Sequence, residues 1–107
     1  MSERYDVRAG VAVSTLDFIS GRPSFYDAGF SIQVACNGNF SLTMLATNLD
    51  PTSASNFVDV TSLFGGAAAI TTNGWYRPSV PSMFGAVRIN VGSLQSAKVL
   101  NLAGAWT

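Results

Sequence analysis

The sequence contains no histidine and only one cysteine, Cys36, among its 107 residues. The absence of histidine removes both the commonest general base and the commonest zinc ligand in proteins. A single cysteine excludes a disulfide within the chain. Cys36 falls on the apolar side of an alternating segment, and no nearby cation or helix N-terminus is present to activate a thiol nucleophile. We therefore expect Cys36 to be a small core residue.

Charged side chains are also scarce, at 11% of the residues, and six Lys+Arg balance six Asp+Glu. A typical soluble domain carries about 25% charged residues. The lack of a basic excess argues against nucleic acid as a partner. With 48% hydrophobic residues and no net charge, the chain has little protection against self-association. We expect a partner to cover part of its surface; the alternative is a monomer with a neutral Ser, Thr, Asn and Gly surface.

No residue pattern in the chain predicts catalysis, a metal site or a cofactor. The six carboxylates, at positions 3, 6, 17, 27, 50 and 59, form no short-range pair of the glycosidase kind and no calcium loop. Asp50 precedes Pro51 and is expected to start a turn. The glycines follow no phosphate-binding spacing. The chain is therefore not expected to be an enzyme.

The beginning of the chain and its apolar runs bear on location. The charged start, MSERYDVRAG, is followed by no apolar signal core, so export by a cleaved signal is not expected. The longest apolar run, at residues 63–70, is too short and too rich in glycine to span a bilayer. We expect no membrane association.

Apolar and polar residues alternate with a period of two along most of the chain, which predicts β-strands. The clearest case is residues 29–47, GFSIQVACNGNFSLTMLAT. We predict a hairpin there, with a three-residue loop that pairs Cys36 with Phe40, because this register puts both apolar sets on one face. Asn73-Gly74 predicts a second hairpin.

Turn signals recur every 8–12 residues, as in a sandwich or barrel, and no segment shows a helical period. Further strands are predicted near residues 4–13, 14–19, 57–60, 75–77, 84–91 and 97–102. The prediction is a single all-β domain over residues 1–107, an antiparallel β-sandwich of about eight short strands with jelly-roll-like connections.

Aromatic residues near turns and chain ends are the candidate interface residues. Trp75, Tyr76 and Arg77 follow a turn and belong to the types enriched at binding hot spots; they could also stack on sugar rings, or Trp75 could close one end of the sandwich. Trp106 is expected to dock on this domain or on a neighbour, since chain ends fray unless held. The complete set of predicted interface residues is Tyr5, Val7, Trp75, Tyr76, Arg77, Phe84, Leu102 and Trp106.

Three stretches carry a resemblance to a known class: residues 29–47, the run Ser55-Asn56-Phe57-Val58-Asp59-Val60, and residues 84–91. In these the chain resembles the small β-sandwich virion proteins of tailed phages, above all the capsid decoration (cement) proteins. The resemblance implies a structural protein made in the host cytoplasm and placed on the capsid exterior. Its implied partners are the major capsid protein and further copies of itself, as a homodimer or homotrimer at a symmetry axis. The alternatives are a receptor- or glycan-binding module of a phage fibre, or a tail or adaptor subunit.

Overall fold

The alternating segments form eight β-strands in the computed structural model, which describes residues 4–19, 30–79 and 84–106. The strands are β1 (Arg4–Arg8), β2 (Thr15–Ile19), β3 (Phe30–Cys36), β4 (Phe40–Thr47), β5 (Val58–Asp59), β6 (Gly74–Tyr76), β7 (Ala86–Leu94) and β8 (Leu100–Trp106). Two short 3₁₀ turns, η2 (Ala54–Asn56) and η3 (Thr61–Phe64), flank β5. The described residues include no α-helix, in agreement with the sequence pattern.

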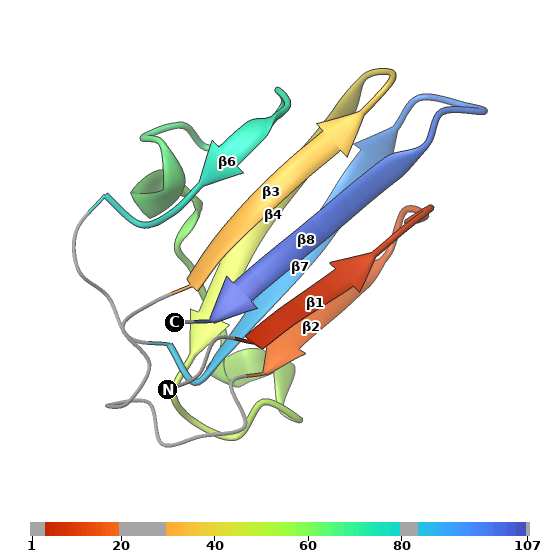
Figure 1. The fold of residues 1–107 in the computed structure, drawn as a ribbon. Helices are drawn as coiled ribbons and strands as arrows, with labels where there is room; N and C mark the ends of the chain where they lie inside the picture. Colours follow the sequence, from red (N-terminus) through yellow and green to blue (C-terminus); the bar gives the residue numbers. More distant parts are fainter. Residues whose placement is uncertain (1–3, 20–29, 80–83, 107) are drawn as a thin grey trace.

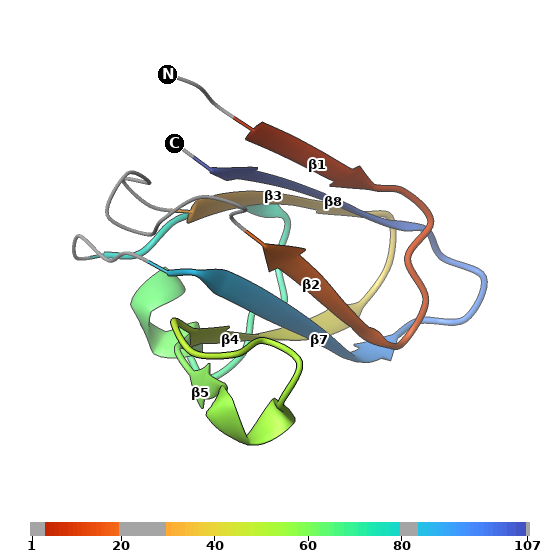
Figure 2. The same cartoon turned by 90° about the horizontal axis from the view of Figure 1, so that it is seen from below.

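The strands form two four-stranded antiparallel sheets that pack face to face (Figures 1 and 2). Sheet A has the order β1-β8-β3-β6 and sheet B the order β2-β7-β4-β5. Consecutive strands change sheet at every step except between β4 and β5. This order is that of a jelly roll, so the prediction of an eight-stranded all-β sandwich is confirmed.

The predicted hairpin of residues 29–47 is wrong, because β3 and β4 lie in different sheets. Cys36, at the end of β3, pairs with Leu100 of β8, and Phe40, at the start of β4, pairs with Leu94 of β7. Both apolar faces are buried as predicted, but they meet across the sandwich and not side by side. Alternation of apolar and polar residues predicts which face of a strand is buried, but it does not predict which strand lies beside it.

Side-chain amides hold residues 37–39 as a crossing between the sheets. The Asn39 backbone N–H donates to Oε1 of Gln95 (3.0 Å), and the Gln95 N–H donates to the Asn39 carbonyl (2.8 Å). Oδ1 of Asn37 accepts a hydrogen bond from the Val99 N–H (2.8 Å). The loop therefore bonds to the connection between β7 and β8 and not across itself.

Asn73-Gly74 does not form a hairpin either. The Asn73 side chain accepts a hydrogen bond from the Cys36 N–H (2.8 Å) and donates one to the Cys36 carbonyl (3.0 Å). It thereby adds side-chain hydrogen bonds to β3 beyond the last backbone pair of β3 and β6, Val34 with Gly74. The preceding segment bridges to sheet B through Ile70 and Leu42, so this Asn-Gly pair lies where the chain crosses from sheet B to sheet A.

The core lies between the sheets and includes an aromatic cluster at one end. The Phe30 ring lies 5.5 Å from the ring of Phe18 and 4.8 Å from that of Trp106, centroid to centroid. All three side chains are buried. Gly104 of β8 faces this cluster, and a β-carbon there would lie 2.8 Å from the Phe18 ring. The absence of a side chain at Gly104 is therefore what gives the rings room.

Candidate interaction surface

The outer face of sheet A carries a row of four residues that lie opposite one another on the four strands. The register pairs Val7 of β1 with Ala103 of β8, Ala103 with Gln33 of β3, and Gln33 with Trp75 of β6. The two end members are largely exposed, Val7 at 67% and Trp75 at 73%. The row therefore has exposed apolar side chains on its outer strands, and Ala103 and Gln33 in the centre.

The described strand residues of this face include no charged side chain, and Arg77 is exposed just beyond the end of β6. Strand alternation turns the buried residues of β3 and β8 to the core and their neighbours outward. We call the following set the uncharged face: Val7, Ser31, Gln33, Ala35, Trp75, Asn101, Ala103 and Ala105. Figure 2 shows that none of the described segments lies over this side of the sandwich. Of the outer faces of the two sheets, it is the one that the described segments leave uncovered.

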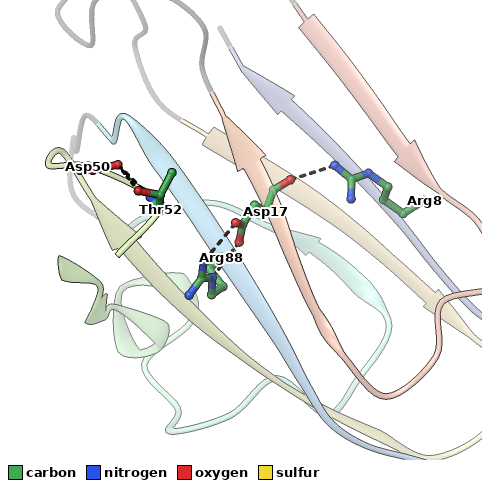
Figure 3. Close-up of polar contacts among 5 residues, drawn as sticks. All are labelled: Arg8, Asp17, Asp50, Thr52 and Arg88. Carbon is green, nitrogen blue, oxygen red and sulfur yellow. Dashed lines mark hydrogen bonds and ion pairs between the residues drawn. The ribbon is translucent and has the colours of Figure 1, made fainter. Parts of the chain in front are cut away.

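The outer face of sheet B is charged and partly covered. Asp17 of β2 and Arg88 of β7 are cross-strand partners, joined by an ion pair of 2.8 Å (Figure 3). The hydrogen bond to Asp17 raises the pKa of Arg88 above its ordinary value. The Arg88 guanidinium also lies over the ring of Phe57, 4.2 Å from its centroid. Phe57 follows η2, and the segment after β4 thus lies against this sheet (Figure 2).

Arg8 closes the side of the sandwich between the edge strands β1 and β2. Its guanidinium donates two hydrogen bonds to Asp6 (2.9 and 2.7 Å) and one to the Asp17 carbonyl (2.8 Å; Figure 3). The bond to Asp6 raises the pKa of Arg8. The same group lies over the Phe18 ring, 4.7 Å from its centroid. A charge directed inward at a sheet edge discourages the addition of a further strand there.

Two carboxylates are engaged within their own turns. Oδ1 of Asp50 accepts hydrogen bonds from the N–H and the hydroxyl of Thr52 (2.9 and 2.7 Å; Figure 3), which lower the pKa of Asp50. Oδ1 of Asp59 accepts the hydroxyl and N–H of Thr61 (2.7 and 2.9 Å), which lower the pKa of Asp59. The turn predicted at Asp50 is confirmed.

The structure offers no cluster of metal-ligating side chains within residues 4–19, 30–79 and 84–106. Over the same ranges it has no helix long and apolar enough to cross a membrane. Cys36 is half-buried at the end of β3 and packs against the core, as expected from the sequence.

The predicted interface residues separate into exposed and buried groups. Trp75 is exposed on the uncharged face, so it does not close an end of the sandwich. Arg77 is exposed just beyond β6. Tyr76 points the other way from Trp75, packs against the core and donates from its hydroxyl to the Thr72 carbonyl (2.6 Å). Tyr5 pairs through its backbone with Ala105.

The remaining three predicted interface residues, Phe84, Leu102 and Trp106, belong to the core of this domain, with exposures of 9%, 1% and 1%. Trp106 therefore docks on its own domain, the first of the two alternatives. In this conformation these three side chains have no surface with which to contact a partner.

Sequence reasoning missed Gln33 and Ala103, the central members of the row. Gln33 was recognised only as a polar position within the alternating segment 29–47, and Ala103 lies beyond the strand predicted at residues 97–102. A signal was present in the small residues 103–105 near the end of the chain, since a run of Ala and Gly cannot fill a core. The register that aligns them with Val7 and Trp75 is visible only in the folded chain.

Comparisons with known proteins identify the fold and no family. No protein-family model matches the chain, and no curated protein matches it. Among solved structures, the chain is similar to the SPBc2 prophage-derived protein YomS, with a TM-score of 0.58 and 11% identity over 99% of this chain and 95% of that one. It is also similar to the Yersinia pseudotuberculosis-derived mitogen, with a TM-score of 0.50 and 10% identity over 99% of this chain and 86% of that one. These likenesses show a shared small β-sandwich fold.

A cyanophage Pam1 capsid chain also matches, at 14% identity over 97% of this chain and 84% of that one, but its TM-score is only 0.28. A TM-score this low does not show that the two chains share a fold. The comparisons therefore support a distant structural relationship to small β-sandwich proteins, one of them from a prophage.

Proposed function

We propose that this chain is a structural virion protein that decorates an assembled phage capsid and stabilises it by bridging neighbouring capsid subunits. The observation that carries the proposal is the uncharged face, a sheet surface with exposed Val7 and Trp75 and no described charged side chain. The proposal also rests on the resemblance of residues 29–47, 55–60 and 84–91 to decoration proteins.

The uncharged face has the composition of a protein–protein contact. The centres of such contacts are depleted in charged residues and enriched in aromatic ones, and tryptophan is prominent among binding hot spots. A surface without charges also loses less hydration free energy when it is covered than a charged surface does. Trp75, exposed on the edge strand β6, is the residue on which we expect binding to depend most.

The mechanism is mechanical and requires no catalytic group. Each copy contributes contacts at the seams between subunits. Repetition around a closed shell multiplies these contacts, because linked binding events reinforce one another without any new contact. A small domain with a weak single contact can therefore stabilise a large assembly.

The test is co-sedimentation with assembled shells of the virus that encodes the chain. We expect the wild type to pellet with shells and to remain in solution with free capsid subunits. Trp75→Glu is expected to weaken pelleting at least tenfold, while Val58→Glu, at a similarly exposed apolar site on sheet B (65%), is expected to pellet as the wild type does. If Trp75→Glu and Val58→Glu pellet equally well, the uncharged face is not needed for attachment to shells.

One observation favours a second candidate function, a glycan-binding module. The exposed indole of Trp75 lies beside its cross-strand partner Gln33, and an aromatic ring with a neighbouring amide can stack on a sugar and bond its hydroxyls. A glycan array with the wild type and Trp75→Ala distinguishes the two functions. Saturable sugar binding that is lost in Trp75→Ala would favour the glycan module over decoration.

A further inference from the structure

We infer that the uncharged face binds a second copy of this chain face to face, about a two-fold axis that runs parallel to the strands between β8 and β3. This inference rests on the proposed function and assigns the uncharged face to contact between copies, so that the surfaces left exposed in the dimer contact the capsid and attachment depends on Trp75 through the dimer. In this arrangement Trp75 of each copy lies over Val7 of the other, and Ala103 of each lies over Gln33 of the other.

The order of side chains along the row is the first argument. Adjacent strands are about 4.8 Å apart, so Val7 and Trp75, three strands apart, are separated by roughly 14 Å across the face. A two-fold axis midway between them exchanges β1 with β6 and β8 with β3. Trp75 then meets Val7 of the other copy and Gln33 meets Ala103, so each larger side chain of the row faces a smaller one. The face is therefore complementary to itself, as an isologous contact requires.

Charge is the second argument. A two-fold contact can bring a charged side chain close to its own copy, which is unfavourable. Among the described residues, none of the charged side chains belongs to the strand positions of the uncharged face: Asp6 and Arg8 face the β1–β2 side, and Asp17, Arg88 and Asp59 belong to sheet B. Arg77 follows β6, the edge strand that the axis exchanges with β1, so the arrangement does not place it against its own copy.

The size of the face predicts a weak dimer. Four strands at about 4.8 Å, and a β8 of seven residues at about 3.4 Å each, bound the face at roughly 450 Å² per copy. Stable complexes bury about 800 Å² per partner. We therefore expect dissociation at micromolar concentrations and below. On a shell, where copies are held close together, the effective concentration is far higher.

Dimerisation gives the proposed bridging a structural basis. A face-to-face dimer carries every remaining surface of the domain twice, related by the two-fold axis. Two identical surfaces can contact two capsid subunits at once, which a monomer with one such surface cannot do. Loss of the dimer is therefore expected to weaken attachment to shells as well.

The first test is sedimentation equilibrium of the full chain from about 5 μM to 1 mM. We expect the wild type to change from monomer to dimer over this range. Val7→Glu and Trp75→Glu are expected to remain monomeric, and Val58→Glu to dimerise as the wild type does. All three sites are largely exposed, so the variants should keep the fold, which circular dichroism checks. A wild type that stays monomeric at 1 mM, or face variants that dimerise normally, would overturn the inference.

The second test examines the geometry in a Cys36→Ser background. Val7→Cys and Trp75→Cys variants are mixed with a bismaleimide cross-linker that spans about 10 Å, the spacing of packed sheets, and each variant is also treated alone. The two-fold arrangement predicts a cross-linked dimer in the mixture and little in either variant alone. Cross-linking of Val7→Cys with itself, at a rate equal to that in the mixture, would contradict the arrangement. A protein that stays monomeric but still pellets with shells would refute the dimer and leave the proposed function supported. A protein that forms the dimer but does not pellet with shells would refute the proposed function and leave the dimer supported.

Discussion

Replacement of Gly104 by alanine is expected to destabilise the fold by overpacking the aromatic cluster. The new β-carbon would lie 2.8 Å from two atoms of the Phe18 ring and 2.9 Å from Cζ of Phe30, closer than van der Waals contact. Neither ring can move easily, because both are buried and Phe30 also packs on Trp106. Overpacking of this kind costs about 1–3 kcal/mol. The reduced freedom of the unfolded chain returns about 0.4–1 kcal/mol, which leaves a net loss of roughly 1–2 kcal/mol.

The assay is equilibrium unfolding in urea together with thermal unfolding. For a domain of about this size each kcal/mol lowers the Tm by roughly 4–8 °C, so Gly104→Ala should unfold about 5–15 °C below the wild type. Gly92→Ala is the matched control, because its β-carbon would meet only the Ser41 carbonyl at 3.8 Å and should change stability by less than about 0.5 kcal/mol. If Gly104→Ala is as stable as Gly92→Ala, the packing described for this end of the core is incorrect.

Three further predictions concern polar contacts. Thr61→Val should cost about 1–3 kcal/mol in urea unfolding, since the buried Thr61 hydroxyl accepts a hydrogen bond from the Met44 N–H (2.8 Å) and its loss leaves that donor unsatisfied; an unchanged midpoint would contradict this. The lowered pKa of Asp59 means that its hydrogen bonds contribute stability above the ordinary Asp value of 3.8 and lose it as the pH falls through the folded-state pKa. The fall in unfolding free energy below pH 4 should therefore be smaller in Asp59→Asn, and an identical pH profile would exclude that contribution. Arg8→Met should lower stability by about 0.5–1.5 kcal/mol and speed hydrogen exchange in β1 and β2, because the bond to the Asp17 carbonyl is lost; unchanged exchange there would show that Arg8 does not hold the two edges together.

Much of the fold was predictable because a strand with one buried face has apolar and polar residues in alternation along the sequence. In the strand predicted at residues 84–91, alternation puts Val87, Ile89 and Val91 on one face and Arg88 on the other. The structure buries the first three and leaves Arg88 half-exposed. The same pattern located most strands to within a few residues. The class of the fold follows from these strands and from the absence of helical segments.

Strand pairing was not predictable in the same way. A hairpin and a crossing between sheets both bury the apolar sides of β3 and β4, so alternation cannot distinguish them. The deciding contacts are made by Asn37, Asn39 and Asn73 with segments distant in sequence. In the sequence these residues read only as turn formers, and their Asn-Gly pairs favoured the wrong local structure.

The candidate surface was predictable in part. Val7 and Trp75 were expected at an interface and lie on the uncharged face, whereas Leu102 and Trp106 were expected there and are buried. The two tryptophans differ because alternate residues of a strand point to opposite faces of its sheet. Trp75 points outward from the edge strand β6, and Trp106 points inward from β8, which lies between two other strands. Without the pairing of β8 between β1 and β3, a tryptophan near the chain end could be assigned to either environment.

The most direct test of the central claim is electron cryomicroscopy of the particle that contains this chain. The account predicts additional density on the exterior of the shell, at the seams between capsid subunits, with this domain present as two-fold pairs whose uncharged faces are in contact. Density for the chain only in the tail or at a fibre tip, or domains on the shell with Val7 and Trp75 facing solvent, would contradict it.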